Sequence, residues 1–336
     1  DRQRILHLFF VKPAPAIRER ALEMRKALRE RRGPASGILF ESTGYPDGGT
    51  YAPRLFSRLY PLESLGFEIL WKKGLYHDRI NTAGYNFRET VDETALKLIL
   101  APRPDLEFVL HGSRRFGYLE QRPEIGLSFS ERLPAGGNLS LRYGKNQIWS
   151  GPVDAVINGG LYDQANAGCY LPLPVDLFVS AESAWRQFRV SGGDYLGEDY
   201  QAIFYFGRYF FKGSAGAAQP LRTLGAYIGY NHYHSGQRDK YRGVIELIHD
   251  TRTITLNLSG HFVFRSRAGL DLRFFGGFDP KRNLKPGDVY GADGQFSLDI
   301  GPAVSLYFGG LFASESIQNQ TSGHYREGRA GLIFHH

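Results

Sequence analysis

Three of the ten histidines are the residues whose type and spacing come nearest to a catalytic or metal-binding arrangement in this 336-residue chain. His232 and His234 lie two positions apart, so both fall on one side of a strand, at a spacing that two metal ligands can share. His249 precedes Asp250, as in half of a general acid–base pair. No serine motif of the G-x-S-x-G kind accompanies them, and we interpret His232 and His234 as polar rim residues. The sequence therefore predicts no catalytic residue, no metal site and no cofactor.

Charged residues and tyrosines recur at alternate positions along much of the chain, with small polar residues between them. The charges have both signs, which is typical of the wall of a water-filled channel. Tyrosine rings offer stacking faces to sugars, although tyrosines also form the interfacial belts of membrane proteins. We expect the following side chains to line a hydrated lumen: Lys97, Glu107, Arg142, Glu182, Arg186, Tyr205, Tyr209, Asp271, Arg273 and Asp299.

The elements that must position these side chains are strands. In residues 253–264, apolar Ile254 and Leu256 alternate with polar Thr255 and Asn257. A period of two places each set on its own face of a strand. The same division into an apolar and a polar face recurs in residues 125–130, 138–143, 270–278 and 296–300.

Short and long connections alternate between the expected strands. Residues 102–105 and 265–267 are short turns, whereas residues 145–163, 234–251 and 279–293 are long and polar. Membrane barrels show this rhythm, with tight turns on one side and longer loops on the other. A soluble β-sandwich or lectin is the competing fold, but its crossings do not require such a rhythm. We interpret the last of the long segments as a candidate plug of the pore.

About sixteen strands fit between residues 51 and 334. Each has roughly ten residues, which is the length that a tilted strand needs to cross a bilayer. Residues 37–42 are a further strand, a lead-in or a plug segment. With one cysteine, Cys169, and no run of about twenty apolar residues, a disulfide framework and a helical membrane span are excluded. The sequence predicts an all-β fold: a transmembrane, antiparallel, up-and-down β-barrel of about 16 strands over residues 36–334, preceded by a short amphipathic α-helix.

The first 35 residues differ from the rest of the chain. Ile17, Ala21 and Leu28 recur at the spacing of one helix face, and Gly33-Pro34 stops the pattern. The other faces are basic and carry much of the net charge of +7. Such a surface is solvated or attracts an acidic partner or lipid headgroups. We expect residues 1–35 to be a periplasmic helical segment, a candidate end of a helical-repeat scaffold, with the basic residues Arg18, Arg20, Arg25, Lys26, Arg29, Arg31 and Arg32.

The last predicted strand carries the most specific local pattern. Ala330, Leu332 and Phe334 share one face, and an aromatic residue ends the alternation. This ending resembles the signal that the bacterial barrel-assembly machinery reads in its substrates, so that machinery is an expected partner. His335 and His336 resemble the remnant of a purification tag, and we expect the barrel to end at residue 334.

Residues 151–211 resemble part of a known family. They contain the loop ending GGLYD (159–163), a Leu-Pro turn (171–174) and the connection DYLG (194–197) before an aromatic strand. The preceding basic run RERALEMRKALRERR is similar to the last helix of a tetratricopeptide array. In these features the chain resembles the outer-membrane β-barrels of exopolysaccharide export that are linked to tetratricopeptide scaffolds. It is most similar to the Pel-type export porin, with the cellulose and poly-N-acetylglucosamine export porins as relatives.

The resemblance implies a pore that exports a secreted biofilm-matrix polysaccharide through the bacterial outer membrane, with both termini in the periplasm. Because the family members are conduits, it implies no enzyme activity. The implied partners are the polysaccharide, outer-membrane lipids and a periplasmic lipoprotein or helical-repeat scaffold, with no nucleic acid. Unlike the family, this sequence shows no long repeat array. Two other functions stay open: a general or substrate-selective diffusion porin, and an outer-membrane hydrolase that uses His232, His234 and His249.

Overall fold

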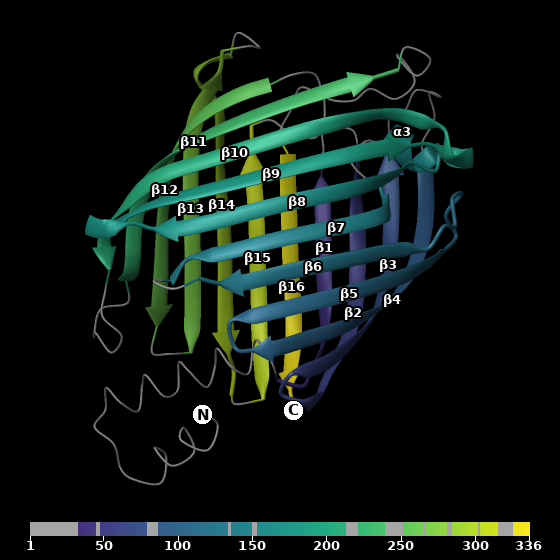
Figure 1. Cartoon of the computed structure of the whole chain (residues 1–336), viewed down its shortest axis with the longest axis horizontal. Helices are drawn as coiled ribbons and strands as arrows, with labels where there is room; N and C mark the ends of the chain where they lie inside the picture. Colours follow the sequence, from purple (N-terminus) through teal and green to yellow (C-terminus); the bar gives the residue numbers. More distant parts are fainter. Residues whose placement is uncertain are drawn as a thin grey trace.

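The part of the chain that the structure describes forms sixteen antiparallel strands that close into one barrel (Figure 1). This confirms the predicted all-β, sixteen-stranded architecture. The predicted basic helix, with its seven Arg and Lys residues between Arg18 and Arg32, lies outside the described residues. The computed structural model describes residues 33–44, 48–78, 87–133, 136–149, 153–212, 221–238, 251–264, 267–280, 284–301, 303–314 and 325–336.

The strands follow one another around the barrel in sequence order. The first eight are β1 (Ala35–Gly44), β2 (Gly48–Leu62), β3 (Leu65–Asp78), β4 (Phe87–Arg103), β5 (Leu106–Phe116), β6 (Glu124–Arg132), β7 (Asn138–Ile148) and β8 (Leu161–Pro172). The others are β9 (Leu177–Arg189), β10 (Tyr195–Lys212), β11 (Leu221–Gln237), β12 (Thr251–Phe264), β13 (Ala268–Asp279), β14 (Leu284–Asp299), β15 (Val304–Ala313) and β16 (Tyr325–His335). The described helical elements are α3 (Val153–Ile157), η2 (Pro174–Asp176) and η3 (Ser191–Gly193).

Strand β1 closes the barrel. Residues 37–42, whose role the sequence left open, lie within it, and Ile38 pairs with Leu332 of β16 on one side and Leu55 of β2 on the other. Strand β16 continues past the predicted end at residue 334, because His335 pairs with Ala35. A closed barrel has no edge strand, so β1 and β16 satisfy each other's backbone groups.

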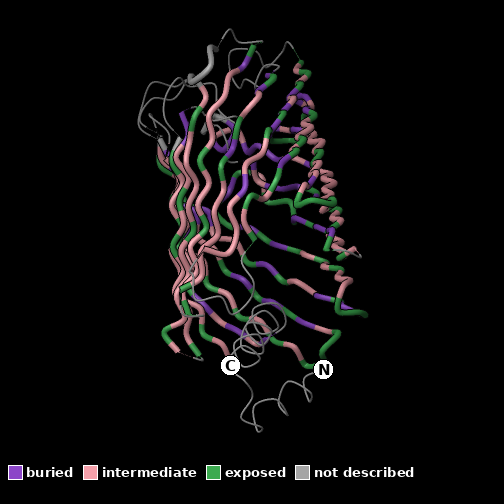
Figure 2. Tube along the Cα trace, turned by 90° about the vertical axis from the view of Figure 1, so that its left-hand side faces the viewer, coloured by how far each residue is buried: buried purple, intermediate pink, exposed green. Residues whose placement is uncertain are grey.

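The described chain begins and ends at one end of the barrel, where the His336 N–H donates to the Pro34 oxygen, and the connections there are short (Figures 1 and 2). Residues 104–105 join β4 to β5, and residues 265–267 join β12 to β13. At the opposite end, residues 149–160 join β7 to β8 and include α3. The predicted alternation of short and long connections therefore holds for these strands.

The predicted long loop over residues 279–293 is wrong. Only residues 280–283 connect β13 to β14, because the pairing resumes where Asp279 meets Leu284. Within β14, Gly291 lies beside Phe275, and a Cβ there would be 2.3 Å from Phe275 Cζ. A residue without a side chain is therefore needed inside the strand to make room for the ring.

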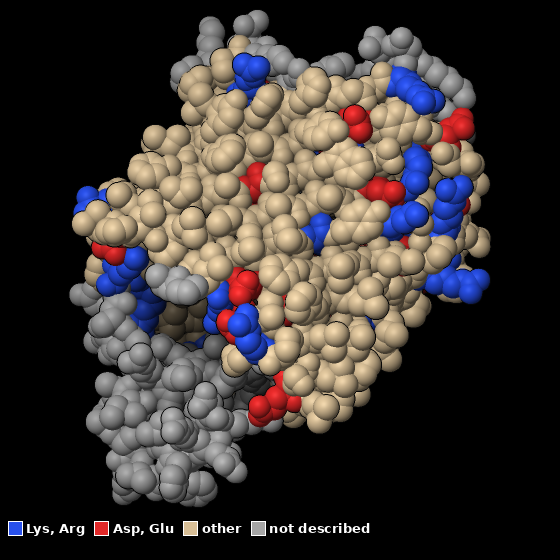
Figure 3. Space-filling view, viewed as in Figure 1, with Lys and Arg blue, Asp and Glu red and all other residues tan. Residues whose placement is uncertain are grey.

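The apolar face of the strands points out of the barrel. Leu256 and Leu258 of β12 are 65% and 48% exposed, whereas Asn257 between them is 3% exposed. The outer surface is accordingly mostly uncharged in Figure 3. So large an apolar surface is unfavourable in water, and the barrel requires an apolar surrounding. No helix in the described part of the chain has the length and apolar content to cross a membrane.

A charge on the outer face should destabilise the barrel more than the same charge on the inner face. We expect Leu256→Arg to lower the free energy of unfolding in lipid vesicles by about 2–4 kcal/mol, because the guanidinium then faces hydrocarbon. Gln295→Arg is the control, since Gln295 lines an internal cavity, and it should cost less than about 1 kcal/mol. Urea titration followed by tryptophan fluorescence measures both, and equal losses would contradict the assignment of the two faces.

Candidate functional site

The inner wall of β2 to β7 encloses a polar cavity of about 560 Å³. Three of the predicted lumen residues, Lys97, Glu107 and Arg142, line it. Lys97 Nζ donates a hydrogen bond to Glu68 Oε1 at 2.7 Å, and Arg58 Nε donates to Glu68 Oε2 at 3.0 Å. Glu68 is only 7% exposed. Two cations therefore compensate this carboxylate, as a buried charge requires.

Sequence reasoning missed Glu68 and Arg58. In β3, Glu68 lies between Phe67 and Ile69, which are 39% and 59% exposed on the outer face. Because successive side chains in a strand point to opposite faces, this order alone turns Glu68 inward. The alternation of outward apolar and inward polar residues around Glu68 was present in the sequence. It was not recognised because the next inward residue, Leu70, is apolar and interrupts the pattern.

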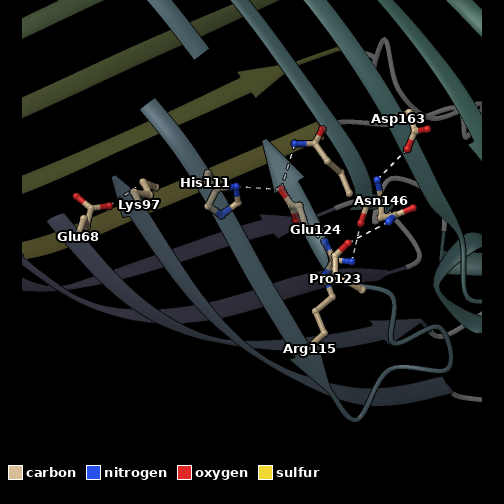
Figure 4. Close-up of polar contacts among 9 residues, drawn as sticks. Glu68, Lys97, His111, Arg115, Pro123, Glu124, Asn146 and Asp163 are labelled. Atoms are coloured by element: carbon tan, nitrogen blue, oxygen red, sulfur yellow. Dashed lines mark hydrogen bonds and ion pairs between the residues drawn. The ribbon is translucent and has the colours of Figure 1, made fainter. Parts of the chain in front are cut away.

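A second buried carboxylate, Glu124 of β6, contacts side chains of the two neighbouring strands, β5 and β7. Arg115 of β5 has a fully buried side chain and donates both to Glu124 and, at 2.7 Å, to the backbone oxygen of Asn146. Gln147 Nε2 donates to Glu124 at 3.3 Å, and His111 Nδ1 lies 3.6 Å from the same carboxylate. Figure 4 shows these side chains following one another across neighbouring strands. The inner wall is therefore fixed here by polar contacts.

Asn146 occupies a bulge of β7 with a φ of 58°. Asparagine tolerates this left-handed conformation better than most residues. Its backbone N–H donates to Asp163 Oδ1 at 2.8 Å, and its Nδ2 donates to the Pro123 oxygen at 3.0 Å (Figure 4). Asp163 also accepts a hydrogen bond from Arg189. These contacts hold the bulge just before the chain leaves β7.

Trp149 and residues 153–160, which include α3, pack against the inner wall at the end opposite the termini. We call these residues the inner segment. Ala155 and Val156 are completely buried. Val156 belongs to an apolar cluster with Tyr76 of β3, whereas Trp149 and Ala155 belong to another with Phe188 of β9. The inner segment therefore bridges two parts of the wall that are far apart in the sequence.

Hydrogen bonds also attach the inner segment to neighbouring connections. The Ser191 N–H donates to the Asn158 oxygen at 2.9 Å. The Tyr118 hydroxyl, from the connection between β5 and β6, donates to the Gly160 oxygen at 2.9 Å. Burial raises the pKa of the Tyr118 phenol above its ordinary value. The inner segment therefore lies against the wall at this mouth, whereas most of residues 279–293, which the sequence suggested as a plug, belong to strand β14.

Five aromatic rings of β8 to β11 form one contiguous group, which we call the aromatic cluster. The ring centroids of Tyr209 and Phe178 are 5.0 Å apart, and Phe178 is 5.8 Å from Tyr170 and from Tyr227. Tyr205 lies 5.3 Å from Tyr227. Two predicted lumen residues, Tyr205 and Tyr209, are thus members of the cluster. Rings at these separations provide an apolar platform with polar hydroxyl groups at its rim.

The predicted lumen residues of β9 lie near the aromatic cluster in sequence but make different contacts. Arg186 Nε donates to Asp199 Oδ1 at 2.9 Å, and the Tyr233 hydroxyl donates to the other oxygen of that carboxylate. Asp199 is completely buried. Glu182 makes no ion pair with any other residue that the structure describes. Arg186 is therefore part of the wall, whereas Glu182 keeps an uncompensated charge.

The remaining predicted lumen residues belong to β13 and β14 and do not join the first cavity. Asp271 and Arg273 border a second cavity of about 240 Å³. Arg273 Nη2 lies 3.4 Å from Asp293 Oδ2. Asp299, near the end that holds the termini, accepts a hydrogen bond from Ser305 Oγ at 2.7 Å. The ten predicted residues are thus distributed around the wall rather than gathered at one site.

The two candidate histidines that the structure describes, His232 and His234, lie on the outer face of β11. His234 pairs with Tyr200, which is 48% exposed on the outer face, and His232 shares that face two residues away. His249 and Asp250 lie outside the described residues. Among the residues that the structure describes, no group of three or more His, Cys, Asp or Glu side chains is placed to hold a metal ion.

The residues of the predicted assembly signal share the outer face of β16. Leu332 pairs with Ile38, which is 38% exposed, and Phe334 is also 38% exposed. Ala330 pairs with Phe40 of β1 on the same face. Recognition by the assembly machinery stays a prediction.

No protein-family model matches the chain, and no curated protein is similar to it in sequence. The fold, however, is similar to that of a solved "Bacterial polysaccharide outer membrane secretin", with a TM-score of 0.69 at 11% identity over 91% of this chain and 99% of that one. Pseudomonas aeruginosa OccK11 (OpdR) gives a TM-score of 0.40 at 12% identity, over 90% and 96%. A BenF-like porin from Pseudomonas fluorescens Pf-5 gives 0.43 at 10%, over 90% and 97%. The first similarity shows a shared fold; the resemblance to the Pel-type family stays a prediction.

Removing one partner of the buried ion pair between Arg115 and Glu124 should be costly. We expect Arg115→Ala to lower the free energy of unfolding by about 3–5 kcal/mol, because it leaves a carboxylate buried without its cation. The control is Arg103→Ala, since Arg103 and Glu131 form an exposed pair at 3.0 Å, which should contribute about 0–1 kcal/mol. Urea titration in lipid vesicles measures both. A loss for Arg115→Ala as small as that of the control would show that the buried pair does not hold the wall.

Proposed function

We propose that the chain is an outer-membrane pore that exports a secreted polysaccharide from the periplasm to the cell surface, as a conduit and not as an enzyme. The observation that carries the proposal is the division of a closed barrel into an apolar outer face and an inner face of charged residues of both signs and aromatic rings. The outer face suits hydrocarbon, and the inner face suits a hydrated, ring-shaped solute.

The same division supports the proposed location, and the lengths of the connections support the proposed orientation. Closed barrels with an apolar band of about 25 Å are the β-structures that span membranes, and their periplasmic turns are short. The short connections of this barrel lie at the end that holds both termini. We therefore place the termini in the periplasm and the inner segment at the cell surface.

Charge compensation favours an uncharged or weakly charged glycan. On the inner wall Glu68, Glu124 and Asp199 are each paired with arginine or lysine. Paired charges create little net field, so an ionic solute gains little from this wall. The aromatic cluster can stack on pyranose rings without specific hydrogen bonds, which lets a chain slide. The solved protein of similar fold is a "Bacterial polysaccharide outer membrane secretin", and this supports a polysaccharide as the proposed solute.

A general or substrate-selective diffusion porin is the second candidate. It is favoured by the 560 Å³ cavity, whose wall offers hydrogen-bond partners of both charge signs to small solutes. The two candidates differ at the inner segment, because an exporter needs a mouth that opens for a polymer whereas a diffusion porin conducts at rest.

The proposal includes partners and segments that lie beyond the described residues. We propose that residues 1–35 face a periplasmic lipoprotein or helical-repeat scaffold, with residues 36–334 as the barrel. The basic residues of the first segment would meet an acidic surface or lipid headgroups. Outer-membrane lipids and the barrel-assembly machinery complete the proposed partners.

Shortening the inner segment should open the pore. We expect replacement of residues 153–158 by a short Gly-Ser linker to raise single-channel conductance in planar bilayers at least about twofold, because α3 and its apolar contacts leave the mouth. The control replaces Val175, an exposed residue of the short turn at the opposite end, by Ser. Unchanged conductance in the linker variant, together with a steadily open wild type, would favour the diffusion porin.

Sugar binding should depend on the aromatic cluster. We expect neutral oligosaccharides to block the current of the linker variant, and Tyr209→Ala to weaken this block about two- to tenfold, because a lost aromatic contact costs about 0.5–1.5 kcal/mol. Tyr230→Ala is the matched control, since Tyr230 is 37% exposed on the outer face. Concentration-dependent block of the current measures both. The export proposal fails if neutral oligosaccharides do not bind, or if both substitutions weaken binding equally.

A further inference from the structure

Three basic residues interrupt the apolar outer face of the barrel on β3, β5 and β7. Lys73 follows Trp71 on that face, and Lys145 follows Tyr143. Arg114 lies two residues before Phe116, which is 49% exposed, and its guanidinium carbon is 5.5 Å from the centre of that ring. Because side chains alternate along a strand, all three basic residues point away from the lumen. We call them the outer basic patch.

The three residues lie at one level of the barrel. Lys73 lies eight positions after Leu65, Arg114 eight after Leu106, and Lys145 seven after Asn138, where the three strands begin at the end that holds the termini. Eight residues rise about 26 Å along a strand and about 20 Å along the axis of a barrel whose strands tilt by about 40°. This height is close to the apolar band of about 25 Å in membrane barrels. The patch therefore lies at the far edge of the band.

None of the three cations forms an ion pair with another residue that the structure describes. The inner wall differs, because its buried carboxylates Glu68, Glu124 and Asp199 are paired with basic side chains. Asp92 lies opposite Lys73 in the register and is the acidic neighbour of the patch, so the four side chains carry a net charge of +2. In Figure 3, Lys and Arg residues gather along the edge of the visible face near α3, in agreement with this position.

We propose that the outer basic patch binds the phosphate groups of a phosphorylated glycolipid in the outer leaflet. The inference rests on the proposed outer-membrane location. Cations at the boundary between hydrocarbon and water are favourable when anionic headgroups compensate them. Trp71, Tyr143 and Phe116 supply the adjoining aromatic surface for the acyl and sugar parts of such a lipid. Three cations spread over five strands fit a ligand with two separated phosphates better than a phospholipid with one.

The test uses the full chain in detergent and native mass spectrometry with bis-phosphorylated lipid A as the probe. The variant carries Lys73→Gln, Arg114→Gln and Lys145→Gln, and should bind lipid A at least about tenfold more weakly than the wild type. The matched control removes three other outward cations through Arg208→Gln, Arg252→Gln and Arg326→Gln, and should stay within about twofold of the wild type. Heat-modifiable migration in gels confirms that each variant folds, and Arg114→Gln alone serves if the triple variant does not.

Three further probes decide what the patch recognises. Lipid A with one phosphate and zwitterionic phosphatidylethanolamine should bind more weakly than the bis-phosphorylated form, and inorganic phosphate should not displace it. The proposal is overturned if the patch variant binds lipid A as tightly as the wild type, or if phosphatidylethanolamine binds as well as bis-phosphorylated lipid A. Planar-bilayer conductance should be the same in the patch variant and the wild type, because the patch faces away from the lumen. A barrel that binds the lipid but does not conduct would contradict the proposed pore alone.

Discussion

The structure depends on one constraint: each strand of a barrel with an apolar outer face must find a backbone partner on both sides. An unpaired N–H or carbonyl group facing hydrocarbon costs several kcal/mol. The chain meets this constraint by pairing β1 with β16, which removes the last free edge. Closure then fixes the parity of all the strands, that is, which alternate residues of each strand face the lumen. A shift by one residue would turn every polar side chain outward. The lumen and the outer basic patch are both consequences of that parity.

The inner wall has two regions with different chemistry. Along β2 to β7, carboxylates such as Glu68 and Glu124 are held by basic side chains from adjacent strands. Along β8 to β11, rings such as Phe178 and Tyr209 also contact one another, in addition to the ion pair between Arg186 and Asp199. The inner segment reaches from one region to the other through two apolar clusters. A solute in the lumen would therefore meet polar groups on one side and stacking surfaces on the other.

The alternation of apolar and polar residues made most of the fold predictable. A strand with one apolar and one polar face shows this alternation in its sequence, as residues 253–264 do. It failed where an inward residue is apolar, as Leu70 is beside Glu68, and where glycine fills a strand position, as Gly291 does beneath Phe275. The inner segment was not predictable in this way. Its buried residues, Ala155 and Val156, contact strands that are distant in the sequence. The local repeat of apolar residues carries no information about such contacts.

The seam between β1 and β16 has a consequence for how the barrel is made. Ala35 of β1 pairs with His335 of β16, so β1 has no second neighbouring strand until β16 pairs with it. Contacts of such sequence separation form slowly, and strands with open edges aggregate while they wait. An incomplete chain therefore cannot form a smaller closed barrel with the same seam. Closure of this barrel therefore needs all sixteen strands, and β1 and β16 offer open edges to other chains until they pair.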